Sequence, residues 1–201
     1  MTSKSKAKGN RFEYEIRDLL NKIYDSKEFA RTPGSGAIMG RSNFAKRQGL
    51  SEEAQNTLGS DLICPAWFPY SVEAKNYADS PIYHTIVTAD DPKLNHWLGE
   101  ACFDARNFGK IPLLFFKTTR KGAFVAFPST LLDNTVQLTH SLNYNGFTVI
   151  GVDHFVQHKE YFRNCVTAQL PKIVEWLESS PRVAELIKFV DDTAAKKKKT
   201  K

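Results

Sequence analysis

The chain is poor in cysteine and has no long apolar run, and both absences narrow the class of protein. Its three cysteines, Cys64, Cys102 and Cys165, are odd in number and lie outside any CxxC pattern, which indicates neither a disulfide framework nor a cysteine zinc site. No stretch approaches the roughly 18 apolar residues that cross a bilayer, and no apolar run follows the basic N-terminus as in a signal peptide. We therefore expect a cytoplasmic protein without a membrane partner.

What the chain does contain is enough apolar sequence for a core, together with an excess of positive charge. Of its 201 residues, 41% are hydrophobic and 12% aromatic, which suits one packed domain that folds without crosslinks. Lys and Arg total 28 against 22 Asp and Glu, a net charge of +6, and this favours a polyanionic partner. The lysine-rich tail at residues 196–201 could contact phosphates or could be a solvated chain end.

The N-terminal part is expected to contain one helix, a short strand and a long basic loop. Apolar residues at helical spacing predict a helix over residues 8–25. Residues 29–31 are typical of a short strand, which ends at a turn over 32–36. Residues 37–58 have no sustained apolar period, which indicates a mobile loop with at most a short helix near its end.

The C-terminal part is expected to alternate helices and strands. Asp91 followed by Pro92 is typical of a helix start, and the nearly continuous apolar run over 111–116 is typical of a strand buried on both faces. A strand, a helix and a strand in succession imply a sheet with a covering helix. The predicted elements are helices at 92–108, 156–170 and 182–190, with breaks at Pro171 and Pro181, and strands at 111–116, 123–127 and 147–152.

Three residues in a predicted hairpin could serve phosphodiester hydrolysis. Residues 61–64 and 70–75 are strand-like runs joined by a proline-bounded segment, so the two strands should be adjacent. Glu73 and Lys75 lie two apart on the second strand and project from one face, while Asp61 on the first could reach the same metal ion. Clustered carboxylates hold Mg²⁺, which activates water and offsets phosphate charge, and a nearby cation assists.

An acidic residue two positions before a lysine is weak evidence by itself, because the pattern occurs three times. The three copies are Asp25-Ser26-Lys27, Glu73-Ala74-Lys75 and Asp91-Pro92-Lys93. Only the second is expected on a strand that follows another strand, since the first comes after a helix end and the third starts a helix. The alternative interpretation of Glu73 and Lys75 is an exposed polar strand face.

The order of these residues resembles the PD-(D/E)xK nuclease superfamily, with Asp61, Glu73 and Lys75 at its three signature positions. The segment Lys8–Leu20, which contains a basic residue, a Gly and Glu13, resembles more closely the opening helix of archaeal-type and phage Holliday-junction resolvases. The family has an Arg and then a Gly-Ser pair next, as Arg31 and Gly34-Ser35 stand here, although residues 37–58 then intervene.

The resemblance implies an α/β fold in which a restriction-endonuclease-like mixed β-sheet is flanked by helices. It divides the chain into a nuclease core over 1–128 that carries the mobile basic insertion at 37–58, an extension over 129–195 packed on this core, and the basic tail at 196–201. The extension and the tail make up the additional C-terminal segment, which the resemblance leaves unexplained.

The resemblance also implies the chemistry. Asp61 and Glu73 would ligate Mg²⁺ together with the carbonyl of Ala74, and Glu13 would complete the metal shell. Mn²⁺ would substitute for Mg²⁺, and no small-molecule cofactor is implied. Lys75 would orient the attacking water or stabilise the transition state.

The implied substrate is a branched or four-way (Holliday) DNA junction, which a homodimer would cut by paired nicks, in the host cytoplasm if the chain is phage-encoded. Arg31 would contact a phosphate. The residues expected to bind DNA are Lys8, Arg11, Arg31, Ser35, Arg41, Lys46 and Arg47.

Other interpretations stay open. The chain could be a PD-(D/E)xK nuclease with another DNA substrate, in replication, repair or end processing, or a non-catalytic DNA-binding module. Glu13 could form an ordinary i,i+4 pair with Arg17 on a helix surface. Glu15 is a second candidate for the role assigned to Glu13.

Overall fold

The computed structural model describes residues 4–32, 60–77, 88–118, 122–133, 135–164 and 166–199. The expected basic loop and the turn before it, from residue 33 onward, lie outside these ranges. The helices are α1 (Lys4–Tyr24), α6 (Pro92–Asn107), the short 3₁₀ helix η2 (Ser129–Leu131), α7 (Val152–Gln157), α8 (Lys159–Asn164), α9 (Val166–Ser179) and α10 (Pro181–Lys199). The strands are β1 (Ala30–Arg31), β2 (Leu62–Ile63), β3 (Tyr70–Tyr77), β4 (Ile111–Thr118), β5 (Gly122–Pro128), β6 (Leu142–Tyr144) and β7 (Phe147–Gly151).

A five-stranded sheet in the order β3-β4-β5-β7-β6 lies at the centre of the fold. β3 and β4 are parallel because α6 returns the chain between them, and the other neighbours are antiparallel. The sheet is therefore mixed and flanked by helices, which confirms the expected α/β, restriction-endonuclease-like architecture. Its last two strands come after residue 128, so the C-terminal part of the chain completes the sheet.

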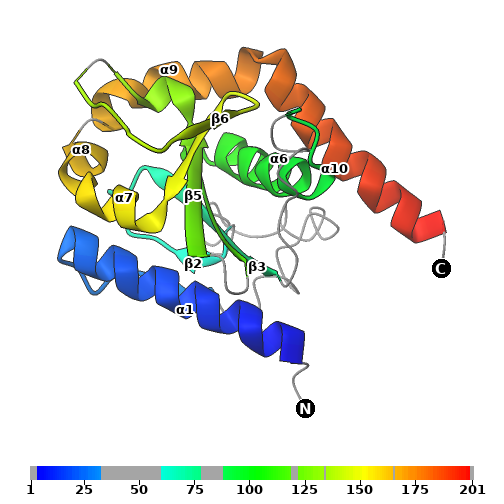
Figure 1. Cartoon of the computed structure of the whole chain (residues 1–201). Coiled ribbons are helices and arrows are strands. Elements are labelled where there is room, and N and C mark those ends of the chain that lie inside the picture. The colour runs from blue at the N-terminus through cyan, green and yellow to red at the C-terminus, as the bar shows by residue number, and fades with distance from the viewer. Residues whose placement is uncertain are drawn as a thin grey trace.

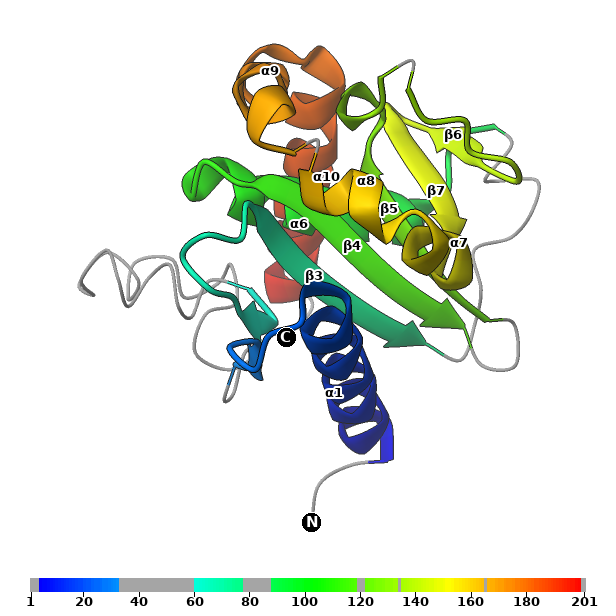
Figure 2. The same ribbon diagram turned by 90° about the vertical axis from the view of Figure 1, so that its left-hand side faces the viewer.

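Helices cover both faces of this sheet (Figure 1). α1, α7 and α8 lie over one face and α6 over the other, with α10 packed along α6, and Figure 2 shows the first group in front of the strands. β4 lies between the two layers, and its residues Ile111, Leu113, Leu114 and Phe115 have no exposed surface, as its continuous apolar run predicts. Among the helices described, none is long and apolar enough to cross a membrane.

The start of α6 is where the sequence predicts it. The side chain of Asp91 accepts hydrogen bonds from the backbone N–H groups of Lys93, at 3.0 Å, and Leu94, at 2.8 Å. Pro92 occupies the first helical position, where no backbone donor is needed. The cap therefore satisfies two N–H groups of the first helical turn, of which that of Leu94 is buried and that of Lys93 half-buried.

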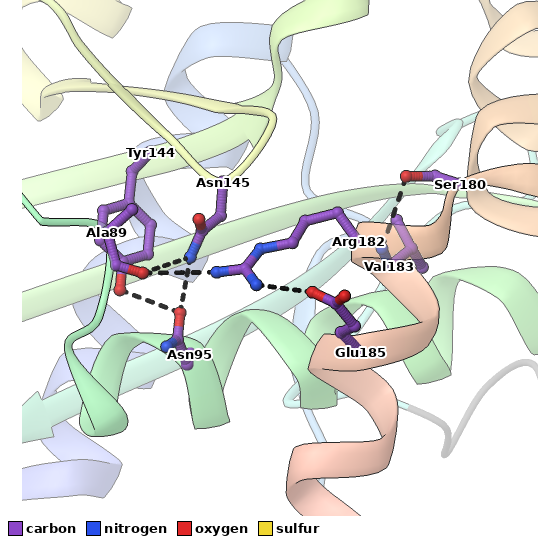
Figure 3. A network of polar contacts seen from close by, with 8 residues as sticks. All are labelled: Ala89, Asn95, Tyr144, Asn145, Ser180, Arg182, Val183 and Glu185. Atoms are coloured by element: carbon purple, nitrogen blue, oxygen red, sulfur yellow. Dashed lines mark hydrogen bonds and ion pairs between the residues drawn. The ribbon is translucent and has the colours of Figure 1, made fainter.

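A polar network behind this cap joins the sheet to two helices (Figure 3). At the end of β6, the hydroxyl of Tyr144 donates to Oδ1 of Asn95 on α6 at 2.9 Å. Nδ2 of Asn145 donates to the same oxygen at 2.7 Å and to the carbonyl of Ala89 at 3.1 Å. Nη2 of Arg182 on α10 donates to that carbonyl at 3.3 Å. The network therefore fixes where α6 and α10 begin relative to the sheet.

Removal of the cap should lower stability. Asp91→Ala removes the acceptor of the buried N–H of Leu94 and of the half-buried N–H of Lys93, so we expect the free energy of unfolding to fall by about 1–2 kcal/mol, measured by denaturant unfolding. The exposed neighbour Asp90 provides the control, because Asp90→Ala should change that free energy by less than about 0.5 kcal/mol. Equal effects of the two substitutions would show that α6 does not depend on its cap.

The two strand-like runs after the basic loop do not form the expected hairpin. β2 pairs with β1 in a separate two-stranded sheet, whereas β3 pairs with β4. Pro65, which has no N–H to donate, follows β2 and limits it to two residues. The expected adjacency holds locally, where the N–H of Asp61 donates to the carbonyl of Val72 at 3.3 Å.

The C-terminal helices differ from the prediction in their ends. The single helix expected over 156–170 is divided among α7, α8 and α9, and Pro171 lies inside α9. The break between α7 and α8 lets Phe155 and Phe162 pack with their ring centroids 4.5 Å apart, and each contacts a phenylalanine of the sheet. β6 has no counterpart among the predicted strands because two of its three residues are exposed.

Candidate active site

β3 forms one edge of the described five-stranded sheet and carries Glu73, Ala74 and Lys75. The two-residue spacing places Glu73 and Lys75 on one face, and the Lys75 ammonium contacts the Glu73 carboxylate. Glu73 is only 8% exposed. The alternative of an exposed polar strand face is therefore wrong.

Asp61 lies beside this strand and makes three hydrogen bonds to the backbone. Its Oδ2 accepts from the N–H of Ala74 at 2.9 Å, and its own N–H donates to the carbonyl of Val72 at 3.3 Å. The carbonyl of Asp61 accepts from the N–H of Thr32 at 3.1 Å, which joins it to the end of β1. Asp61 is thereby fixed against the backbone on either side of Glu73.

α1 contributes Glu13, which is also 8% exposed. Its carboxylate pairs with the guanidinium of Arg31, which in turn donates from Nη2 to Oδ1 of Asn10 at 2.9 Å. The surface pair considered between Glu13 and Arg17 does not form, because Arg17 pairs with Asp18 at 2.6 Å. Glu13 therefore lies inward, toward β1 and the segment that carries Asp61.

Burial and the charge of Asp61 perturb the carboxyl groups of Glu13 and Glu73. Burial raises the pKa of Glu73 well above its ordinary value, and the charge of Asp61 raises it further against the opposing effect of Lys75. Burial also raises the pKa of Glu13, with Asp61 again adding to the effect and Arg31 opposing it. Asp61 is the common neighbour, because its charge acts on both glutamates, which come from two other segments of the chain.

At Lys75 the charges of neighbouring groups together have a larger effect on the pKa than burial has. Burial lowers its pKa, but the nearby carboxylates of Glu73 and Glu100 outweigh burial and hold the pKa well above the ordinary lysine value. The ammonium therefore stays protonated at physiological pH.

Glu100, on α6, lies 2.9 Å from Nζ of Lys75 and was not singled out from the sequence. The only signal was its i,i+4 spacing from His96 on a helix expected to cover the sheet.

The donor set fits a hard divalent cation in its chemistry. Mg²⁺ prefers carboxylate and carbonyl oxygens, which Asp61, Glu73 and the backbone of Ala74 can supply, and a cation among them would relieve their repulsion. Within the described ranges, no group of three or more His, Cys, Asp and Glu side chains is already arranged to hold a metal ion. The two glutamates of the site engage basic side chains instead.

The residues expected to bind DNA have varied surroundings. The carbonyl of Lys8 accepts a hydrogen bond from a side chain of β3, and the side chain of Arg11 is 83% exposed and lies 3.4 Å from Glu15, the second candidate for the role of Glu13. The side chain of Arg31 is 15% exposed. Ser35, Arg41, Lys46 and Arg47 lie outside the described residues. Contact with DNA stays a prediction for all seven.

Comparison with known proteins gives a family match. The model of a family described as "Phage putative PDDEXK endonuclease" matches residues 4–179. The chain is also similar to Protein D14 of Escherichia phage T5, with 29% identity over 142 residues, which cover 70% of this chain and 82% of that protein. No solved structure matches. The family match spans all the elements that carry Glu13, Asp61, Glu73 and Lys75.

Proposed function

We propose, because the chain belongs to the phage PDDEXK endonuclease family, that it is a Mg²⁺-dependent endodeoxyribonuclease that resolves four-way DNA junctions by paired nicks. The observation that carries the nuclease activity is that the carboxylate of Asp61 is hydrogen-bonded to the backbone between Glu73 and Lys75, with Glu13 near enough to feel its charge. The junction as substrate is supported by the sequence, in which the Lys8-Gly9 setting of Glu13 resembles the opening helix of junction resolvases.

Each residue of the site has a separate task in this proposal. Asp61 and Glu73 would hold Mg²⁺ together with the carbonyl of Ala74, and Glu13 would complete the oxygen shell. Bound Mg²⁺, or Mn²⁺ in its place, supplies activation of water and neutralisation of phosphate charge. Lys75 stays protonated beside its carboxylate partners, so its ammonium can orient the attacking water or stabilise negative charge on the phosphate.

A four-way junction has two strands to cut, so paired nicks require two active sites. A twofold homodimer presents two copies of one site on one substrate. Recognition would then depend on the shape of the junction and the positions of its phosphates rather than on base sequence. The net charge of +6 supports binding to such a polyanion.

Cleavage of a four-way junction in Mg²⁺ tests the proposal. With each strand labelled in turn, we expect nicks at symmetric positions in two opposed strands, and a cruciform plasmid should give linear product rather than nicked circles. A linear duplex with the same arm sequences is the control substrate and should be cut far more slowly. EDTA should abolish cleavage, and sedimentation should show a dimer.

Two other results would redirect the proposal. Faster cutting of flapped, gapped or linear DNA than of the junction would support a nuclease whose substrate is not the four-way junction. Junction binding without cleavage, by folded protein supplied with Mg²⁺ and Mn²⁺, would favour a non-catalytic DNA-binding module.

A further inference from the structure

The ammonium group of Lys75 lies between carboxylates from two different elements. It contacts Glu73 on β3 and lies 2.9 Å from Oε2 of Glu100 on α6. The side chains of Lys75 and Glu100 are 19% and 30% exposed, so solvent screens the pair only in part. The contact joins the edge strand to the helix that covers the sheet.

The two carboxylates are not equivalent if the site works as proposed. Glu73 belongs to the acidic group around Asp61 and would share its charge with a metal ion. Glu100 stands on another element, and its contact with Lys75 does not pass through that group. Glu100 is therefore the partner that can keep the ammonium in place while Glu73 serves a second cation.

A histidine lies beside the other oxygen of Glu100. Nε2 of His96, one helical turn earlier, lies 3.6 Å from Oε1 of Glu100. Nδ1 of His96 lies 3.3 Å from the hydroxyl of Thr193 on α10, the helix packed along α6. Glu100 therefore has Lys75 at one oxygen and His96 near the other, and its close contact is the one with Lys75.

We propose that Glu100 is a positioning residue, which orients the Lys75 ammonium toward the reacting phosphate without touching the DNA itself. The inference rests on the proposed function, because it takes Lys75 to act on a phosphodiester. The simpler interpretation is an ion pair that only joins α6 to β3 and stabilises the fold. The two interpretations differ in what a substitution at Glu100 would change.

Glu100→Gln keeps the size of the side chain and removes its charge. We expect single-turnover cleavage to slow by about 10- to 100-fold, as when a catalytic group is misplaced by about 1 Å, with junction affinity in Ca²⁺ and melting temperature unchanged. Glu100→Asp, which restores the charge, should recover part of the rate. Glu185→Gln is the matched control, because Glu185 also pairs with a basic side chain, Arg182 at 2.6 Å, but on α10. It should cleave at the wild-type rate.

The reactivity of the Lys75 amine gives a readout that needs no cleavage. Labelling with acetic anhydride, followed by peptide mass spectrometry, reports how readily each lysine reacts. Glu100→Gln should raise the labelling of Lys75 several-fold, because it releases the amine from one of its two carboxylate partners. Lys117, which pairs with Glu15 at 2.7 Å, is the internal reference, and Glu185→Gln should leave the ratio of the two lysines unchanged.

Each outcome decides between these interpretations. Unchanged Lys75 labelling in Glu100→Gln, or cleavage by that variant at the wild-type rate, would overturn the inference. A loss of DNA affinity or of melting temperature in step with the rate would show a structural role instead. If the wild-type chain cleaves no DNA while Lys75 labelling responds to Glu100→Gln, the proposed function fails and the placement of Lys75 by Glu100 is upheld.

Discussion

Glu73→Gln is expected to abolish DNA cleavage, with a fall in the single-turnover rate on the order of 10³-fold, while DNA binding is retained. Glutamine keeps the shape of the buried side chain but loses the charge that would hold a divalent cation. The backbone contacts that fix Asp61 do not involve the Glu73 side chain, and Lys75 keeps its contact with Glu100. The loss should therefore be confined to the chemical step.

Cleavage is measured at saturating protein in Mg²⁺, and affinity by gel shift in Ca²⁺ with the same junction. Burial and the charge of Asp61 disfavour the ionised form of Glu73 and raise its pKa, so we expect Glu73→Gln to melt no earlier than the wild-type chain. Glu160→Gln is the control, because Glu160 is exposed and lies 3.4 Å from Arg163 at the surface. Cleavage by Glu73→Gln near the wild-type rate would show that β3 is not part of the active site.

Gly99→Ala is expected to displace α10 and to lower the stability of the whole chain. A Cβ atom at Gly99 on α6 would lie 2.3 Å from the backbone carbonyl oxygen of Leu186 and 2.6 Å from Cγ2 of Val190. A backbone carbonyl cannot rotate away as a side chain can, so the two helices must separate. Overpacking of this kind typically lowers the free energy of unfolding by about 1–3 kcal/mol. For a chain of this length, that corresponds to a fall in Tm of about 2–12 °C.

Gly9→Ala gives a matched control for Gly99→Ala. Gly9 also lies inside a helix, α1, but a Cβ atom there would meet nothing within 4 Å. Because alanine is favoured over glycine in a helix by about 0.5–1 kcal/mol, the control should be slightly stabilised. Thermal unfolding of both variants measures the contrast. Equal melting temperatures for Gly99→Ala and the wild-type chain would show that α10 can move away from α6 without loss of stability.

Strong local patterns were sufficient to predict the elements next to the site. α6 begins at Pro92 as predicted, because an N-cap, a proline and a helical apolar stripe agree there. The continuous apolar run of β4 predicted a strand buried on both faces, and its burial confirms this. The shared face of Glu73 and Lys75 followed from their spacing alone.

Contacts between distant segments could not be predicted in this way. Asp61 contacts β3 through hydrogen bonds to single backbone groups rather than through the ladder of a hairpin. The alternation of apolar and polar residues along a strand does not predict contacts of this kind. The contact of Glu100 with Lys75 depends on how α6 crosses the sheet. The pair between Glu13 and Arg31 joins a helix to a strand whose mutual placement the sequence does not specify.

Asp61 has a second role at the edge of the sheet, which β3 forms among the residues that the structure describes. An edge strand presents unpaired backbone groups on which a strand of another molecule can assemble. On β3, Asp61 occupies two such groups, the carbonyl of Val72 and the N–H of Ala74, and so takes the place of a neighbouring strand at that point. The acid proposed to hold the metal ion therefore also occupies hydrogen-bonding groups that a strand of a second molecule would otherwise use. We expect a substitution that removes its carboxylate to free the N–H of Ala74 at this edge as well as to disable the site, whereas the hydrogen bond from the backbone N–H of residue 61 to Val72 remains.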